Sequence, residues 1–396
     1  MMAVAEQTGN WLAEFTTQKR VDGWLEELRQ TAFARFAEVG FPTTHDEEWR
    51  FTNVASIART QFRHVHPSFH VSGGALPAGV RVGTNEDLRA HLAKYAAVDG
   101  NPFVALNTAF LDAVAVFRIG RGAVVERPLE LVFHAEPGAD AAAIHPRVLI
   151  LAGENSQCAI VEKYTGSGRY FTNAVTEIVA ADGAIVDHYK IQQESLEAFH
   201  VATLAAQLGR SSNFTSHSIS LGGALVRNDV NVVLSEGTEA TINGLYIVNG
   251  TQHIDNHTSI DHVKPHGTSH ELYKGILDDQ ARAVFNGRII VRQDAQKTDS
   301  KQTNKNLVLS DDAVIDTKPE LQIWANDVRC THGATIGQLD AESLFYLQSR
   351  GIGKQQARAL LTYAFAQDIV DRIKVPSLRD SLERVLFEKF HEHREK

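Results

Sequence analysis

The feature that most constrains the fold is a stretch of about 200 residues, 117–327, in which no long amphipathic helix can be recognised. Short apolar runs alternate there with clusters of Gly, Asn, Asp and Ser, as in RVLILAGEN, GLYIVNG, GRIIVRQD and ELQIWAND. Apolar residues recur at every second position within the runs, for example at Ile289 and Val291, which is the repeat of a β-strand. The middle of the chain is therefore predicted to consist of β-strands.

The same stretch limits how these strands can be arranged. A doubly wound α/β sheet needs crossover helices between its strands, and the pattern contains none. A β-sandwich and a parallel β-helix are both compatible with short strands joined at turns. The uneven spacing of the strands, and polar segments such as QKTDSKQTNKN, which we interpret as corners, favour a solenoid.

Helical patterns precede the strands. Residues 17–39 carry apolar side chains at helical spacing, and Gly40 and Pro42 end this segment. Residues 85–100 are predicted to form a short helix capped by Asn85.

Helical patterns also follow the strands. Asp340 is a suitable N-cap for AESLFYLQSR, Gly351 is a suitable C-terminal stop, and two further helices are predicted on either side of Pro376. The predicted organisation is an N-terminal helical domain at 1–80, a β-rich core at 81–335 and a C-terminal helical domain at 336–396.

Composition argues against several classes of function. The formal net charge is −9 without a dense Lys/Arg block, so neither nucleic acid nor an anionic membrane surface is an expected partner. No run approaches the roughly 20 apolar residues of a membrane helix, and the N-terminus does not resemble a secretion signal. Two cysteines cannot form a disulfide framework, and Cys158 is expected to be a small buried apolar residue. We expect a cytoplasmic protein.

One short segment suggests metal chemistry. DVRCTHGAT places a thiol and an imidazole two positions apart, at Cys330 and His332. Residues i and i+2 of a strand point to the same side, about 7 Å apart. Both side chains are good ligands for iron or zinc, but a stable tetrahedral site needs four ligands. Either another chain supplies the missing ligands to an open, labile site, or the two residues only end a strand.

Two other segments resemble binding motifs in part. GIGKQ lacks the earlier glycine and the following Ser or Thr of a phosphate loop, so nucleotide binding is not expected. In HIDNHTSIDHVKPHGTSH, two histidines four positions apart on one strand lie roughly 13 Å apart, too far to bind one ion directly. We favour hydrogen-bonded strand and turn residues over a metal site for His253, His257, His262, His266 and His270.

Four long segments carry a family resemblance: FPTTHDEEWRFTN, GTQHIDNHTSIDHVKPHGTSHELYKGIL, VFNGRIIVRQDAQKTDSKQTNKNLVLSDDA and DVRCTHGATIGQLDAESLFYLQSRGI. Together they resemble the SufB/SufD family of iron–sulfur cluster assembly proteins of the SUF system, over about residues 41–373. The ending Cys-Thr-His-Gly, and a stretch at 161–164 without cysteine, are more similar to the SufD branch than to the SufB branch.

The resemblance implies a mainly β fold, with a right-handed parallel β-helix core flanked by N-terminal and C-terminal α-helical domains. It implies a non-catalytic scaffold subunit of a SufBCD complex, which pairs with a SufB-like paralogue and docks a SufC-like ATPase. Cys330 and His332 resemble residues at the SufB–SufD interface, where a nascent cluster forms. The expected cofactor is then a transient iron ion or iron–sulfur cluster, with none tightly bound.

The helix corner after the strands is the expected docking surface for the ATPase. Phe345, Tyr346, Arg350 and Gly351 combine aromatic and Arg side chains at a turn between helices, a composition common at interface hot spots. The alternative is that these aromatic residues only pack within the helical domain.

Two other functions remain open. One is a homodimeric scaffold that handles metal or clusters without a SufB-like partner. The other is a polysaccharide lyase, since parallel β-helices often host such enzymes with carboxylates and basic residues along one sheet. Asp255, Asp261 and Lys264 would form that catalytic face.

Overall fold

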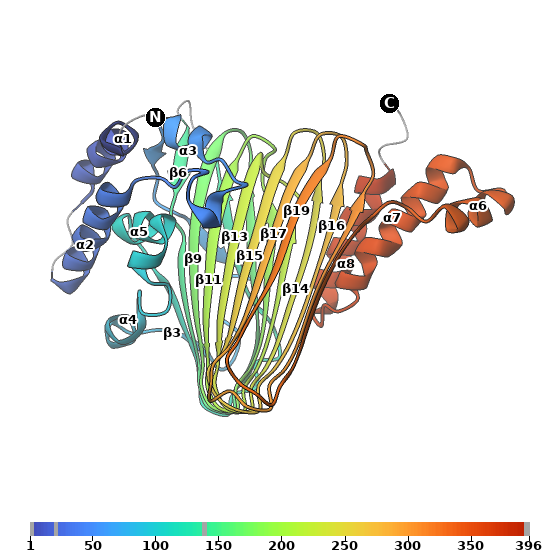
Figure 1. Ribbon diagram of the computed structural model, residues 1–396. Helices are drawn as coiled ribbons and strands as arrows, with labels where there is room; N and C mark the ends of the chain where they lie inside the picture. Colours follow the sequence, from blue (N-terminus) through green and yellow to red (C-terminus); the bar gives the residue numbers. More distant parts are fainter. Residues whose placement is uncertain (1–3, 20–22, 137–140, 392–396) are drawn as a thin grey trace.

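The computed structural model describes residues 4–19, 23–136 and 141–391. At its centre the chain winds as a solenoid and lays its strands alternately into two sheets (Figure 1). Along the solenoid each strand pairs in parallel with strands two places away in the sequence, so that one coil contributes one strand to each sheet. The prediction of a parallel β-helix core with helices at both termini is confirmed.

The two sheets are called sheet A and sheet B. Sheet A contains, in spatial order, β3 (Val80–Val82), β4 (Ala115–Ile119), β7 (Arg147–Ala152), β9 (Tyr170–Ala180), β11 (Phe199–Leu208), β13 (Leu225–Leu234), β15 (His253–His262), β17 (Arg282–Val291) and β19 (Val314–Ile323). Sheet B contains β2 (Phe69–Val71), β5 (Leu129–Ala135), β8 (Gln157–Gly166), β10 (Ile185–Gln193), β12 (Asn213–Ser220), β14 (Glu239–Val248), β16 (Thr268–Leu277), β18 (Asp299–Val308) and β20 (Arg329–Gly337). Two short strands, β1 (Arg63–His64) and β6 (Ala142–Ile144), pair beside β9.

A repeated corner keeps the coils in register. At one turn of successive coils a residue adopts a positive φ, and its backbone N–H donates to the carbonyl of the residue just before the equivalent position in the next coil. Glycine occupies this corner in some coils, whereas others place a larger residue in the left-handed region, which only glycine enters without strain. The corner residues are Gly122, Asn155, Gly183, Ser211, Gly237, His266 and Lys297.

The space between the two sheets, here called the lumen, holds the largest apolar core of the molecule. Residues such as Ile178, Leu204 and Ile289 fill its apolar part, and Cys158 is buried among them, as expected. Another part of the lumen is lined by hydrogen-bonded polar side chains. QKTDSKQTNKN belongs largely to this polar part, because its residues 299–306 form most of β18. The interpretation as a corner is therefore correct only for its start, where Lys297 lies at the repeated corner, and wrong for the rest.

The N-terminal helices cover the outer face of sheet A (Figure 1). They are α1 (Val4–Thr17), α2 (Trp24–Val39), α3 (Ala55–Arg59), α4 (Asn85–His91) and α5 (Pro102–Ala109), with 3-10 turns η1 (Glu47–Trp49) and η2 (Val98–Gly100). Trp11, Phe36 and Phe103 pack there with Phe171 of β9 and Phe199 of β11. α4 and α5 lie after residue 80, and α5 packs against α2, so the N-terminal helical group extends beyond the boundary predicted at residue 80. The domain boundaries stay predictions.

Two helices of this group differ from their predictions. The segment predicted at 17–39 is divided, because Thr17 is the last residue of α1 and α2 begins at Trp24. The N-cap of α4 is Thr84 rather than Asn85, because the Thr84 hydroxyl accepts from the N–H of Asp87 while the Asp87 carboxylate accepts from the N–H of Thr84. The helix also ends at His91 instead of continuing to Gly100.

The C-terminal helices are α6 (Ala341–Ser349), α7 (Lys354–Val370) and α8 (Pro376–His391). Of these, α7 and α8 cover the outer face of sheet B, and α6 contacts α7. Asp340 caps α6 by accepting from the N–H of Ser343 over 2.7 Å, and Gly351 has a φ of 87°, so both predicted boundaries are confirmed. The segment KQQARALLTYAFAQDIVDRI predicts an apolar stripe along α7, but Leu360 of that stripe is exposed. None of the described helices combines the length and apolar character needed to cross a membrane.

The two ends of the solenoid differ. At the first end, sheet A finishes in β3 and sheet B in β2, two strands of three residues each that pair antiparallel with their neighbours. At the other end the sheets finish in the long strands β19 and β20, of ten and nine residues. We call this second end, formed by β19 and β20, the open end.

Candidate functional site

Cys330 and His332 lie at the open end, on β20. In the register of β18 and β20, Cys330 is the partner of Ser300 and His332 the partner of Gln302. Ser300 and Gln302 are buried, and the amide of Gln302 reaches across the lumen to Gly287 on sheet A. Cys330 and His332 therefore share one face, as their spacing predicts, and that face is turned toward the mouth of the lumen.

The two side chains differ in their surroundings. Cys330 is half-buried against the edge of the lumen core, and burial together with the charge of Asp299 raises the pKa of its thiol. A thiol of raised pKa stays protonated at neutral pH, so binding of a metal ion here must release a proton. His332 is exposed. The chain thus presents one soft and one borderline ligand side by side at its surface.

A buried polar pair lies directly below this site, and the sequence analysis missed it. Gln302 donates from Nε2 to Oε2 of Glu271 on β16 over 2.6 Å, and burial raises the pKa of the Glu271 carboxyl to about 7. The available signal was the alternation within DSKQTNKN, in which every second side chain enters the lumen. These inward-facing residues are Ser300, Gln302, Asn304 and Asn306.

Apolar side chains surround the open end. Trp324, just after β19, is 56% exposed and Ile336 on β20 is 55% exposed, while Ile323 at the end of β19 is also exposed. Exposed apolar groups beside sheet-edge strands mark a surface suited to contact with another protein.

The predicted docking corner lies on α6, which projects beyond α7 and α8 in Figure 1. Phe345 is 73% exposed and Tyr346 is 56% exposed. The Arg350 guanidinium lies 5.1 Å from the centre of the Tyr346 ring, and Gly351 provides the left-handed turn into α7. The structure brings these four residues together at the surface, where the aromatic side chains do not fill a core.

The histidine run has structural partners. His253 bonds to the hydroxyl of Thr52 at 2.9 Å, and His262 bonds to that of Ser269 at 2.9 Å. His266 occupies the repeated corner, with a φ of 62°, and His270 is exposed. Within the described residues, no histidine of this run belongs to a group of three converging metal ligands. His253, His257 and His262 are thus hydrogen-bonded strand residues and His266 is a turn residue, as the preferred interpretation predicts.

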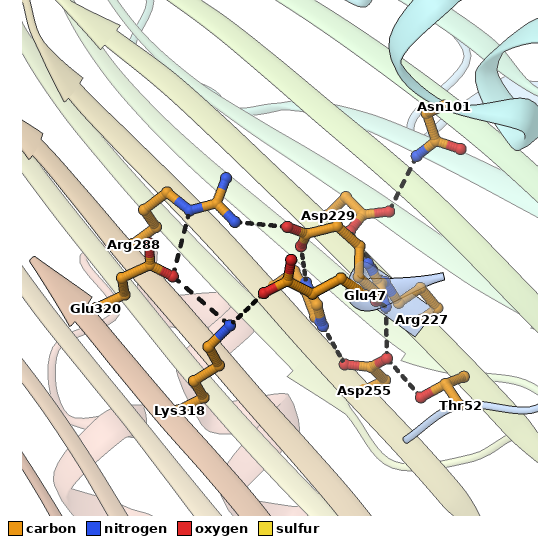
Figure 2. Close-up of polar contacts among 11 residues, drawn as sticks. Glu47, Thr52, Asn101, Arg227, Asp229, Asp255, Arg288, Lys318 and Glu320 are labelled. Atoms are coloured by element: carbon orange, nitrogen blue, oxygen red, sulfur yellow. Dashed lines mark hydrogen bonds and ion pairs between the residues drawn. The ribbon is translucent and has the colours of Figure 1, made fainter. Parts of the chain in front are cut away.

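Ion pairs and hydrogen bonds fasten the N-terminal segment around residues 47–52 to sheet A, as Figure 2 shows. His257 lies 3.2 Å from Glu48 and 3.0 Å from Asp255, and Arg227 binds Asp255 at 2.6 Å. Arg288 binds Glu48 at 2.6 Å, and further ion pairs join Lys318 of β19 to Glu47 and Glu320. We call Glu48, His257 and Arg288 the N-terminal clamp.

The clamp bears on the lyase alternative. Asp255 is covered by the N-terminal segment and held by Arg227, and Asp261 forms two hydrogen bonds with Arg292. Lys264 lies beyond the end of β15. These residues therefore do not form an open groove of free carboxylates along one sheet.

Comparisons with known proteins agree with this architecture. The family model described as "SUF system FeS cluster assembly, SufBD core domain" matches residues 134–365. An iron–sulfur cluster assembly SufBD family protein of Synechocystis is 34% identical, over 91% of this chain and 90% of the relative. The iron–sulfur cluster assembly protein SufD of Escherichia coli is 30% identical over 89% and 90%, and SufD of Bacillus subtilis is 27% identical over 73% and 67%. The chain, with its parallel β-helix and its match across the core, therefore belongs to the SufBD family of iron–sulfur cluster assembly proteins.

Proposed function

We propose that the chain is a SufD-like, non-catalytic scaffold subunit, which pairs with a SufB-like paralogue through its open end and docks a SufC-like ATPase through α6. The single observation that carries this proposal is the open end itself. Two long terminal strands, exposed apolar side chains and the Cys330/His332 pair lie there together.

The edges of β19 and β20 provide the means of pairing. The outer edge of a terminal strand presents backbone N–H and C=O groups that another chain can pair with. A partner that adds one strand beside each would continue both sheets by β-augmentation, and its side chains would cover Trp324 and Ile336. Backbone pairing would set the register, and burial of the apolar side chains would add affinity.

Such a junction would bring further ligands to Cys330 and His332. Two ligands from this chain leave a tetrahedral iron site half-complete, and a paralogue facing the mouth of the lumen can supply the others. A site divided between two chains opens when the chains move apart, which suits release of a cluster. Iron and sulfide are then substrates that pass through the junction. We place this work in the cytoplasm, where the free thiols of Cys158 and Cys330 stay reduced.

The α6 corner supports the second partner. Burial of an exposed Phe and Tyr next to an Arg is a frequent source of binding energy at protein interfaces. Residues 338–340 connect β20 to α6, so an ATPase bound to α6 would act close in sequence to the cluster site. Movement of the ATPase could thus be passed to the junction.

Pairing is tested by introducing a charge at the open end. We expect Trp324→Asp and Ile336→Asp to reduce co-purification with a SufB-like paralogue at least tenfold, because pairing would bury an uncompensated carboxylate. Leu196→Asp, a change at an equally exposed position in a turn between coils, is the matched control and should leave pairing intact. Unchanged pairing in both open-end variants would refute the proposed interface.

The homodimer alternative is tested with the same variants. If the full chain alone forms a dimer in sedimentation, the open-end variants dissociate it, and the SufB-like paralogue never co-purifies, then the chain acts as a homodimeric scaffold. Recovery of a stable complex of wild-type chain, paralogue and ATPase contradicts that alternative.

A further inference from the structure

Three metal-ligating side chains converge at the N-terminal side of the solenoid. His64 and His66 lie two positions apart at β1, and Asp112 follows the C-terminal end of α5. Oδ2 of Asp112 bonds to Nε2 of His64 and lies 2.8 Å from Nδ1 of His66. One donor atom from each residue lies within 4.8 Å of the other two.

The first of these ligands is held rigidly. The His64 ring packs against two rings that also stack on each other: its centre lies 4.9 Å from that of Phe110 and 5.4 Å from that of His145, on which it is stacked with an interplanar angle of 22°. The backbone N–H of His64 donates to the Glu14 carboxylate of α1 over 2.9 Å.

The carboxylate is also fixed by its surroundings. Asp112 lies just after α5, and Asn107 of that helix donates to the carbonyls of Pro146 and Asn173. Arg29, a basic residue of α2, donates to the carbonyl of Ala109 at the end of α5 and is paired with Glu26 at 3.8 Å. Two of the three ligands thus stand on a buried, hydrogen-bonded framework, which is the preorganisation a metal site requires.

The third ligand is free to adjust. The side chain of His66 is 77% exposed, whereas that of His64 is 1% exposed. A metal ion lies about 2.0–2.2 Å from nitrogen and oxygen ligands, so donor atoms around it are roughly 3–3.5 Å apart. The hydrogen-bonded cluster therefore has to open by only a few tenths of an ångström up to about 1 Å, and His66 can make much of this movement.

From this geometry we propose that His64, His66 and Asp112 form a binding site for a divalent first-row transition metal such as Fe²⁺, Co²⁺ or Zn²⁺. Two imidazoles and one carboxylate form a borderline ligand set that suits these cations, and the absence of sulfur from the set disfavours soft Cu⁺. Three protein ligands leave coordination positions open to water, so the ion is exchangeable. The Glu14 carboxylate adds negative charge nearby.

The site is separate from the candidate cluster site. β6, the partner of β1, joins β9, whereas Cys330 and His332 lie on β20 at the other end of the solenoid. Neighbouring strands are about 4.8 Å apart, so the five strand spacings from β9 to β19 alone separate the sites by on the order of 25 Å. The inference concerns this chain alone and does not depend on its pairing with other subunits.

The experiment titrates the full chain with Co²⁺ and with Zn²⁺ in a Cys330→Ser/His332→Ala background, which removes the other ligand pair. We expect one equivalent of bound metal, with a visible d–d spectrum for Co²⁺ and no sulfur-to-cobalt charge-transfer band. His66→Ala should weaken binding by about 100-fold or more, and Asp112→Asn should act in the same direction. Because His66 is exposed, its removal should leave the melting temperature of the metal-free protein unchanged.

His70→Ala is the matched control, since His70 is an exposed histidine a few positions further along the chain. This variant should bind Co²⁺ as the background protein does. The proposal is overturned if the background protein binds neither ion at millimolar concentration, or if His66→Ala binds as tightly as His70→Ala. Either result would mean that Asp112 only bridges two histidines by hydrogen bonds.

Discussion

Gln302 donates a hydrogen bond of 2.6 Å to Glu271, and this pair forms the floor of the lumen mouth beneath His332. Burial raises the pKa of Glu271 to about 7, compared with an ordinary value of 4.5. The folded protein therefore keeps a proton on this carboxyl at pH values where the unfolded chain has lost it. A proton-bearing group thus lies two strands below the candidate cluster ligands, because β18 stands between β16 and β20.

This carboxyl should make stability fall as pH rises. Its folded pKa is raised, so its contribution is lost progressively between about pH 4.5 and 7, by on the order of 3 kcal/mol in total. We expect Glu271→Gln, which cannot ionise, to gain stability relative to wild type as the pH is raised from 5 to 8.5. Melting curves at several pH values measure this difference, with Glu197→Gln on the surface as control. A difference independent of pH would contradict the buried-acid assignment.

Substitution of the exposed imidazole should separate folding from assembly. His332→Ala is expected to change unfolding free energy by less than about 0.5 kcal/mol and to leave pairing intact, while cluster formation by the complex falls. Cys330→Ser should reduce cluster formation to a smaller or equal degree, since serine keeps the shape but is a poor ligand for iron. The measurements are thermal melts, co-purification and cluster absorbance on the same preparations.

Thr331→Ala is the control for that pair, because Thr331 lies between the two residues on β20 and faces the opposite side of the sheet. Wild-type cluster formation by His332→Ala would rule out His332 as a ligand. If His332→Ala lowers the melting temperature or co-purification, and cluster formation falls only as a consequence, then His332 only ends a strand.

The α6 corner makes a prediction about the ATPase. Phe345→Ala and Tyr346→Ala should each weaken binding of a SufC-like ATPase by about tenfold or more, because hot-spot truncations cost about 2 kcal/mol or more. Both side chains are exposed, so the melting temperature should hardly change. Phe387→Ala, at an exposed position on α8, serves as control. Binding isotherms equal to wild type for both α6 variants would place the ATPase elsewhere.

The N-terminal clamp should depend on pH in both directions. The hydrogen bond between Glu48 and His257, together with the contact to Arg288, lowers the pKa of the Glu48 carboxyl to about 2. Burial alone would lower the pKa of His257, but the charge of Asp255 and hydrogen bonds to Asp255 and Glu48 raise it. The Glu48 contribution is present above about pH 4.5 and lost toward pH 2, and the His257 contribution is present below about pH 6.5 and lost as pH rises through its raised pKa.

The clamp should therefore hold best between about pH 4.5 and 6.5. We expect hydrogen exchange of a peptide covering residues 41–53, after correction for the intrinsic rate, to show greater protection at pH 5.5 than at pH 8.5. His257→Gln should remove most of this difference, whereas His45→Gln in the same segment should keep it. Equal protection of the wild type at both pH values would contradict the prediction.

Local patterns identified the strands and most helix ends, but not the inside of the solenoid. Asp340 and Gly351 act within one turn of their own helix, so nearby residues suffice to predict them. Ser300 and Gln302 were assigned to a corner because a strand with polar side chains on both faces has no apolar repeat. Their partners, such as Glu271, lie a full coil away in the sequence, and only the register brings them together.

The two candidate metal sites show the same limit. The i, i+2 spacing placed Cys330 and His332 on one face, but the pairing of β20 with β18 decides that this face is the lumen mouth. His64 and His66 have the same spacing, and their third partner, Asp112, is 48 positions from His64. The path of α5 across sheet A brings it there, and no local pattern in the sequence reports that path.

The inequality of the two solenoid ends limits how large an assembly can grow. Two three-residue antiparallel strands finish the first end, while β19 and β20 leave the second available. A protein that can pair at both ends of its solenoid can form filaments of any length, whereas a protein that can pair at one end binds a single partner there. Two such chains that meet by their long strands use up every free edge at once. The proposed pairing would therefore give a closed pair instead of a fibre, and it would cover the long strand edges at which cross-β aggregation can begin.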